Sequence, residues 1–253
     1  MDYTIKPPNI KRPQDETGKL PKGFNTDILP DPSKGFMLGI VAPRGSGKSV
    51  LLYNILKFYD KCFDQIEIMN PTGALDPLLS PDSLGLPEDA FHDHIDTDLI
   101  NNIFDEQMKD REDRAVMKGK KPHLKRILVV LEDCITDPNF SSNKNTNIMN
   151  KLAFRGRHAI INVIVISQYY CGLSKRFRVN IPNWIFFRTD NNKERKAIEE
   201  EQSGTTNENV FIKMYEYATR EDFDFFFIYG THPDKSMRFR RNLDNVINPK
   251  DFL

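Results

Sequence analysis

Residues 42–49 read APRGSGKS and fit the pattern G-x-x-x-x-G-K-[ST], with alanine in the place of the first glycine. The apolar run FMLGIVA at residues 36–42 stops at a proline and predicts a buried strand. Residues 48–59 then carry apolar side chains at the spacing of an amphipathic helix. A strand, a glycine-rich turn and a helix in this order predict a phosphate-binding loop, and they constrain the chain to an α/β fold.

The residue types in this loop suit the chemistry of phosphate binding. Gly45 and Gly47 allow backbone N–H groups to turn inward, and a helix that begins at Lys48 adds the positive end of its dipole. Lys48 would reach the β and γ phosphates, and Ser49 would ligate Mg²⁺. We therefore expect ATP with Mg²⁺ to be bound by Ala42, Pro43, Arg44, Gly45, Ser46, Gly47, Lys48, Ser49 and Val50.

The apolar run ILVVL at residues 127–131 predicts another buried strand, and it ends in Glu132 and Asp133. A parallel strand beside the first one would carry both carboxylates to the sheet edge where Lys48 lies. One acid can then hold the metal ion while the other deprotonates the attacking water. By position we assign Glu132 to Mg²⁺ and Asp133 to catalysis, although these roles could be exchanged. The plainer alternative is a strand that leaves the sheet into solvent through two acids.

Gln168 follows the apolar run INVIVIS at residues 161–167, where a polar side chain can contact the γ-phosphate or position water. Just upstream, Arg157 and Arg155 are candidates for an arginine that completes a neighbouring subunit's site. Arg176 and Arg178 are weaker candidates for the same role. The structural alternatives are that Gln168 only caps a strand and that the arginines only favour a helix C-terminus.

Short apolar strands alternate with helices, which predicts a mostly parallel sheet covered by helices on both faces. Repeated prolines predict an extended N-terminal arm at residues 1–34, followed by the α/β core at 35–230 and a C-terminal strand and tail at 231–253. The remaining strands are expected at residues 65–70, 183–189, 224–230 and 237–242. The remaining helices are expected at residues 95–111, 145–157, 193–202 and 208–218, and residues 71–87 are expected to be loop.

The charge balance limits how the chain could meet nucleic acid. Lysine plus arginine number 36, as do aspartate plus glutamate, so any DNA contact must be a local patch. Two basic segments are candidates, residues 118–126 and the group Lys235, Arg238, Arg240 and Arg241, although charge runs in loops are more often simply solvated.

Cysteine usage and hydropathy bear on the compartment. The three cysteines lie far apart, which argues against a zinc ribbon and against a disulfide scaffold. The start of the chain lacks the apolar segment of a signal peptide, and no apolar run is long enough to span a bilayer. We therefore expect a soluble intracellular protein with no membrane span.

With these segments in view, the chain resembles the genome-packaging ATPases of large eukaryotic DNA viruses and virophages, the poxvirus-type branch of the FtsK–HerA superfamily. The matching segments lie between residues 36 and 190: VAPRGSGKS, LVVLEDC, RGRH, VIVISQ and NIPNWIFF. The resemblance implies a P-loop NTPase with a RecA-like core of the additional-strand, catalytic-acid (ASCE) division. The extra strand at residues 65–70 between loop and acids suggests the same division. The resemblance further implies a homo-oligomeric ring, a pentamer or hexamer, that pumps double-stranded DNA into a preformed capsid at its portal vertex. The expected location is the host cytoplasm at the site of viral assembly, or the virion.

Two other functions remain open from the sequence. A P-loop nucleotide kinase or other phosphotransferase would need an acceptor site and an arginine-rich lid, and the long separation between loop and acids argues against it. A non-catalytic assembly protein would bind ATP only to stabilise its shape, and the intact Lys48, Ser49 and two acids argue against that.

Overall fold

The computed structural model describes residues 16–71, 76–134, 148–204 and 206–253, and in this part of the chain nine strands form one sheet. The strand order is β3-β2-β4-β5-β1-β6-β7-β8-β9, parallel from β3 to β6 and antiparallel from β7 onward. The strands are β1 (Met37–Val41), β2 (Gln65–Met69), β3 (Phe91–His92), β4 (Ile127–Glu132), β5 (Ile161–Ser167), β6 (Asn183–Phe187), β7 (Phe225–Tyr229), β8 (Phe239–Arg241) and β9 (Asn245–Val246).

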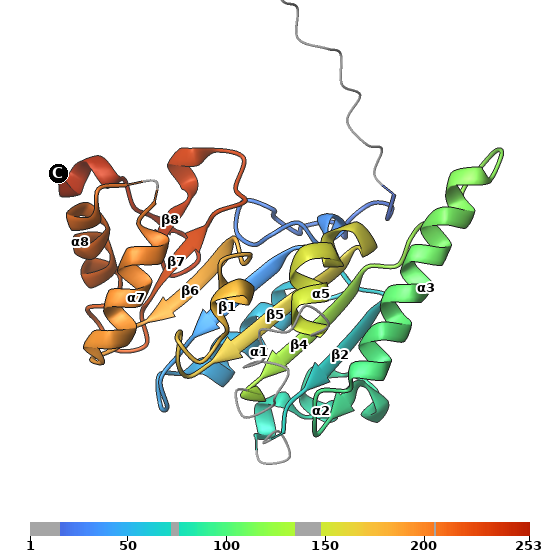
Figure 1. The fold of residues 1–253 in the computed structure, drawn as a ribbon, viewed down its shortest axis with the longest axis horizontal. Helices are drawn as coiled ribbons and strands as arrows, with labels where there is room; N and C mark the ends of the chain where they lie inside the picture. The colour runs from blue at the N-terminus through green and yellow to red at the C-terminus, as the bar shows by residue number, and fades with distance from the viewer. Residues whose placement is uncertain (1–15, 72–75, 135–147, 205) are drawn as a thin grey trace, which may run out of the picture.

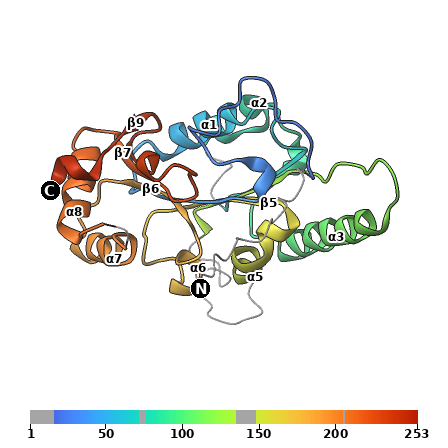
Figure 2. The ribbon, with the colours of Figure 1, turned by 90° about the horizontal axis from the view of Figure 1, so that it is seen from above.

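Helices cover both faces of the sheet and make a three-layer molecule, as Figures 1 and 2 show. One face carries α1 and α2, and the other carries α3, α5, α6 and α7. The helices are α1 (Lys48–Phe58), α2 (Pro81–Leu84), α3 (Thr97–Val116), α5 (Ile148–Arg155), α6 (Lys175–Arg178), α7 (Asn192–Gln202) and α8 (Glu208–Ala218). Short 3₁₀ turns are η1 (Pro32–Lys34), η3 (Pro77–Leu79), η4 (Glu88–Ala90), η6 (Gly156–Ala159), η7 (Lys235–Met237) and η8 (Pro249–Phe252).

The two faces of the sheet form two separate hydrophobic cores because side chains alternate along each strand. In β1, Leu38 and Ile40 pack with Leu52 and Ile55 of α1. Met37 and Val41 point to the opposite core, which includes the apolar residues of α3, α5, α7 and α8. Every residue of β1, β4, β5 and β6 is buried, as the continuous apolar runs in the sequence predict for strands covered on both faces. The predicted mostly parallel α/β fold is therefore confirmed.

One feature of the topology differs from the prediction. β4, which ends in the two acids, is not next to β1, because β5 lies between them and pairs with both. The strand between β1 and β4 is therefore β5, residues 161–167. β2 pairs with the other edge of β4, away from β5. The carboxyl ends of all these strands still meet at one sheet edge, because the strands are parallel.

Residues 16–34, predicted as an extended arm, contain little regular structure, and residues 24–30 pack against the α1 face of the sheet. Leu29 is fully buried, and the ring of Phe24 stacks on Tyr59 with 5.2 Å between ring centroids. The Tyr59 hydroxyl donates a hydrogen bond to the Pro30 carbonyl over 2.8 Å. Residues 1–15, the first part of the predicted arm, lie outside the described residues.

The C-terminal residues widen the sheet. β8 pairs antiparallel with β7, as the two predicted terminal strands suggested. Arg240 is buried, with its guanidinium close to the rings of Phe227 and Tyr229. Arg241 donates to the Asp224 carboxylate. Because Arg240 is buried, the sequence-based suggestion that it contacts DNA is wrong for this residue, whereas for the partly exposed Arg241 it stays a prediction.

Local capping explains where several element boundaries differ from the prediction. α3 runs on to Val116, beyond the predicted end at 111, and Asp96 caps its start. The predicted loop at 71–87 contains η3 and α2, whose first turns are capped by Asp76 and Ser80. The predicted helix at 145–157 begins outside the described residues and continues as α5 and η6. None of the helices in the described part of the chain combines the length and apolar character needed to cross a bilayer.

We predict that Gly39→Ala destabilises the protein, because a methyl group on Gly39 in β1 would overlap the fully buried ring of Trp184. Overpacking of this kind lowers the free energy of unfolding by about 1–3 kcal/mol or more. Urea unfolding measures the change. Gly204→Ala is the matched control, since open space surrounds Gly204 and a surface change of this kind shifts stability by less than about 0.5 kcal/mol. Equal stability of both variants would contradict the close contact between β1 and β6.

Candidate active site

The glycine-rich loop lies between β1 and α1, at the sheet edge where the parallel strands end. Gly45 and Gly47 have φ angles of 81° and 87°, in the left-handed region that side chains disfavour. Gly47 also serves as the N-cap of α1, and no side chain caps this helix start. The first N–H groups of α1 therefore have no partner within the helix and can bind an anion, with the helix dipole adding to the attraction.

Lys48 joins the loop to the two acids at the end of β4. Its Nζ atom lies 3.4 Å from Glu132 Oε1 and forms a short ion pair with Asp133 Oδ2. These three side chains are largely shielded from solvent, with exposed fractions of 16%, 3% and 14% for Lys48, Glu132 and Asp133. The structure thus brings the ammonium group and both carboxylates to one place, although 84 residues or more of sequence separate Lys48 from the acids.

Glu132 is the most buried charged group of this cluster. Burial raises its pKa above the ordinary glutamate value, and the neighbouring Lys48 ammonium only partly opposes this. Its Oε2 atom accepts a hydrogen bond of 2.8 Å from Asn70 Nδ2. Asn70 comes directly after β2 and was not identified from the sequence. Its position after an apolar strand that runs parallel to β4 is the signal that could have found it.

Asp133 has an uncommon backbone conformation, with φ at 48° in a residue other than glycine. Its backbone N–H donates to the Ile166 carbonyl of β5 over 3.3 Å. Its Oδ1 atom accepts a hydrogen bond of 3.3 Å from Gln168 Nε2. Gln168 therefore contacts a catalytic candidate and does more than end a strand. Backbone strain of about 1–3 kcal/mol is typical of residues that the surrounding structure holds for a function.

The side chains at this edge fit a hydrated magnesium ion. Ser49 lies in the first turn of α1 and offers a hydroxyl oxygen, and Glu132 offers a buried carboxylate whose raised pKa a nearby cation would lower. Within the described residues, no group of three or more His, Cys, Asp and Glu side chains could hold a metal alone. Magnesium usually takes one or two protein oxygens and completes its shell with water and phosphate oxygens, so this donor set suits it.

The candidate arginines lie elsewhere. Arg157 is next to Gly35, which comes just before β1: a Cβ on Gly35 would be 2.8 Å from the Arg157 Cα. β1 has five residues at about 3.3 Å each, so roughly 16 Å of strand separates Arg157 from the loop in the same chain. Arg155 lies with its guanidinium 5.4 Å from the centroid of the Phe104 ring. Neither arginine completes the site of its own chain.

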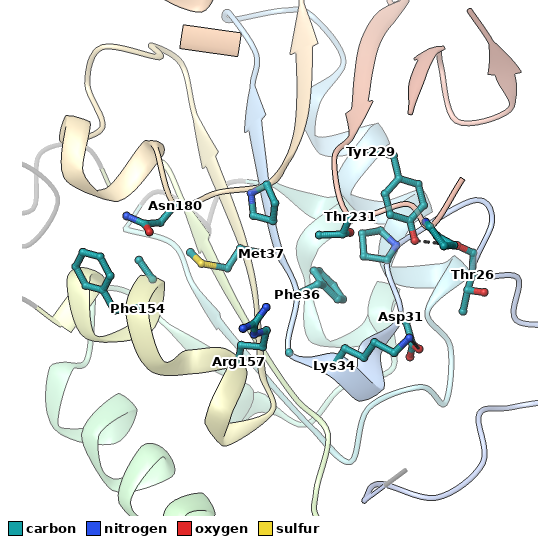
Figure 3. Close-up of a pocket in the computed structure, with 15 residues that line it drawn as sticks. Thr26, Asp31, Lys34, Phe36, Met37, Phe154, Arg157, Asn180, Tyr229 and Thr231 are labelled. Carbon is teal, nitrogen blue, oxygen red and sulfur yellow. Dashed lines mark hydrogen bonds and ion pairs between the residues drawn. The ribbon is translucent and has the colours of Figure 1, made fainter. Parts of the chain in front are cut away.

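Figure 3 shows the cavity of about 700 Å³ that Arg157 lines at this opposite sheet edge. Lys34 and Asp31 lie at the same cavity, and so does Phe154, whose side chain is 53% exposed. Of the other two arginine candidates, Arg178 is held by its own chain: its Nε and Nη2 atoms donate to the Glu201 carboxylate over 2.7 and 2.6 Å. Arg178 is therefore engaged within its own chain, and its contact with another subunit stays a prediction.

We predict that Glu132→Gln slows catalysis and stabilises the fold. Gln keeps the hydrogen bond with Asn70 but removes a buried carboxylate. Because burial raises the pKa of Glu132, the folded state binds its proton more tightly than the unfolded state does. The wild type therefore loses stability relative to the variant as pH rises from 4.5 through the raised pKa, and the difference is constant above it. The substitution also removes a proposed ligand of Mg²⁺. The loss of several kcal/mol of transition-state stabilisation by the metal would lower ATP turnover by about 10²-fold or more.

Thermal unfolding without nucleotide or magnesium, measured from acidic to mildly basic pH, tests the first effect, and phosphate release tests the second. If the melting temperature of the wild type increased relative to that of Glu132→Gln as pH rises, the raised pKa would be contradicted. Glu67→Gln is the matched control, a second largely buried glutamate that pairs with His92 on β3, away from the loop.

No model of a known protein family matches the sequence, and no curated protein matches it. Solved structures do match in three dimensions. The genome packaging NTPase B204 from Sulfolobus turreted icosahedral virus 2, in complex with AMP, superposes with a TM-score of 0.58 at 13% identity, over 85% of this chain and 99% of that one. The conjugation coupling protein TcpA of pCW3 gives a TM-score of 0.57 at 16% identity, over 86% of this chain and 62% of TcpA. The type VII secretion ATPase EccC of Thermomonospora curvata gives a TM-score of 0.53 at 12% identity, over 85% of this chain and 26% of EccC. At these identities the likeness concerns the fold: the chain has the fold of the P-loop ASCE ATPases, shared with a viral packaging NTPase and with coupling and secretion ATPases, as its sequence resemblance implied.

Proposed function

We propose that the protein is a magnesium-dependent ATPase that drives double-stranded DNA into a preformed viral capsid. The observation that carries the proposal is the cluster of Lys48 with the buried Glu132 and Asp133, beside a glycine-rich loop that leads into α1, whose start no side chain caps. The matching structures support the nucleotide, because B204 was solved in complexes with AMP, AMPPCP and ATP-γS.

Each residue of the site has a proposed role. The loop amides and Lys48 bind the phosphates, and Ser49 with Glu132 holds Mg²⁺, which would stabilise the negative charge that develops on the phosphates. Asp133 accepts the proton of the attacking water. Gln168 holds the Asp133 carboxylate in place through the hydrogen bond to Oδ1 and lies close enough to orient the water as well.

Arg157 acts in a neighbouring subunit in this proposal, within a ring of five or six copies. The placement of Arg157 beside Gly35 supports this, because the length of β1 separates it from the loop of its own chain. A ring in which each copy contacts the next head to tail brings opposite edges of the fold together. Arg157 at one edge would then reach a phosphate site at the other.

Double-stranded DNA is the proposed cargo, and the packaging function of B204 supports it. Among the basic segments, residues 118–121 after α3 are largely exposed and remain available for phosphate contacts. A capsid portal vertex is the proposed partner, and the host cytoplasm at the assembly site, or the virion, is the proposed location.

We predict that double-stranded DNA stimulates ATP hydrolysis by the purified protein, because a motor couples turnover to its track. Phosphate release with and without DNA measures the effect. Asp133→Asn should lower the rate by about 10²–10⁴-fold, since it removes the proposed base but keeps the side chain's size. Transfer of phosphate to a nucleoside in place of hydrolysis would favour a kinase. A rate that DNA leaves unchanged, in a protein that stays monomeric, would argue against a motor.

We predict that Lys48→Ala and Arg157→Ala proteins are each inactive alone and regain activity when mixed. Lys48→Ala subunits lack the phosphate site, Arg157→Ala subunits lack the arginine, and a mixed ring restores complete sites at roughly a quarter of its interfaces. An arginine supplied in trans contributes about 10³–10⁵ in rate, so the recovery is measurable as phosphate release.

Lys34→Ala is the control for this mixing experiment, because Lys34 is an exposed cation at the same cavity. Alone, it should retain activity. Arg155→Ala, mixed in the same way, decides between the two neighbouring arginines. Mixtures of Lys48→Ala with either arginine variant that remain inactive would exclude both arginines from the neighbouring site.

A further inference from the structure

Phe223 is an exposed aromatic residue in a strained turn. It lies between α8 and β7, and 68% of its surface is exposed. Its φ angle is 66°, a region that bulky side chains rarely adopt and that costs about 1–3 kcal/mol. Strain and exposure at one aromatic residue are both unfavourable for the isolated chain, so a structural role in packing does not account for this residue.

The ring of Phe223 borders the phosphate-binding loop. A Cβ placed on Gly47 would lie 3.2 Å from the Phe223 Cδ1 atom. This proximity follows from the topology: β7 is antiparallel to β6, so the turn that precedes β7 lies at the edge where the parallel strands end. The aromatic ring is thereby placed beside the N-cap of α1, where the phosphates of a nucleotide would bind.

The turn is held rigidly by the residue that follows Phe223. The Asp224 carboxylate accepts hydrogen bonds of 2.7 Å from Arg241 Nε and from Asn242 Nδ2, and it forms an ion pair of 2.5 Å with Arg241 Nη2. The backbone of Phe225 and the Asn242 side chain are joined by a further hydrogen bond of 3.2 Å. These contacts fix the backbone on the C-terminal side of Phe223, so the turn holds this residue next to the loop.

We propose that Phe223 stacks on the nucleobase of the nucleoside triphosphate whose phosphates occupy the loop. This inference rests on the proposed nucleotide function and adds the contact for the base. The loop amides and Lys48 recognise phosphate only, whereas an aromatic face attracts the flat π-system of a base. Stacking tolerates any base, because every base has a π-face. Adenine and guanine nucleotides should therefore depend on Phe223 to a similar degree.

Equilibrium binding to the full chain, measured by calorimetry with Mg²⁺, tests the proposal with three probes: AMPPCP, GMPPCP and inorganic tripolyphosphate, which has no base. Phe223→Ala should weaken binding of both nucleotides by about 5- to 150-fold, the equivalent of about 1–3 kcal/mol at 1.4 kcal/mol per tenfold. Tripolyphosphate should bind as to the wild type. Phe223→Asn should behave like Phe223→Ala, and since asparagine readily adopts positive φ, it tests the ring without straining the turn.

Two further variants sharpen the result. Phe223→Trp should keep nucleotide binding, and its fluorescence should change with AMPPCP but not with tripolyphosphate; the natural Trp184 is fully buried in β6 and provides a constant background. Val116→Ala is the control, an exposed apolar residue at the end of α3 whose loss should change no affinity.

Wild-type affinity of Phe223→Ala and Phe223→Asn for AMPPCP would overturn the stacking contact. Equal weakening of AMPPCP and tripolyphosphate would also overturn it, because Phe223 would then support the loop and not the base. A wild type that binds AMPPCP through Phe223 but never hydrolyses ATP would overturn the motor function while supporting the base contact. Failure of the wild type to bind either kind of probe would overturn both.

Discussion

The ion cluster of Lys48 with Glu132 and Asp133 is the interaction on which the rest of the site depends. Two carboxylates at one sheet edge repel each other, and removing them from water is costly, so a cation must lie between them. Lys48 supplies that charge, yet burial still leaves the pKa of Glu132 raised. The cluster therefore has one positive charge against two negative charges. An excess of negative charge of this kind suits a site that would bind a metal ion together with a phosphate chain.

The sheet topology makes this cluster possible. Parallel strands end at a common edge, so the loop after β1, the acids at the end of β4 and Gln168 after β5 converge although β1 and β4 are not paired. The antiparallel β7 then adds its preceding turn to the same edge, and with it Phe223. The residues proposed to contact phosphate, metal and base therefore come from separate strand connections, and the buried strands set the spacing between them.

The opposite sheet edge carries a different set of groups. Arg157, Lys34 and Asp31 lie there around a cavity, at the start of β1. A molecule with its phosphate site at one edge and a candidate arginine at the other is suited to head-to-tail assembly, because each copy supplies what its neighbour lacks. In the proposed ring, the length of β1 would separate the phosphate-binding loop of each copy from the arginine that the same copy supplies to its neighbour.

The sequence alone determined the glycine-rich loop, the apolar strands and the acids and glutamine that follow them, because glycine placement and hydrophobic periodicity are local properties of the chain. The sequence also predicted several helix boundaries, such as those of α8 at residues 208–218. Only the tertiary structure decided that β5 lies between β1 and β4, that Asn70 donates to Glu132, that Arg240 is buried among aromatic rings and that Phe223 borders Gly47. These are contacts between segments far apart in sequence, and their partners are set by strand order and packing, which no local pattern records.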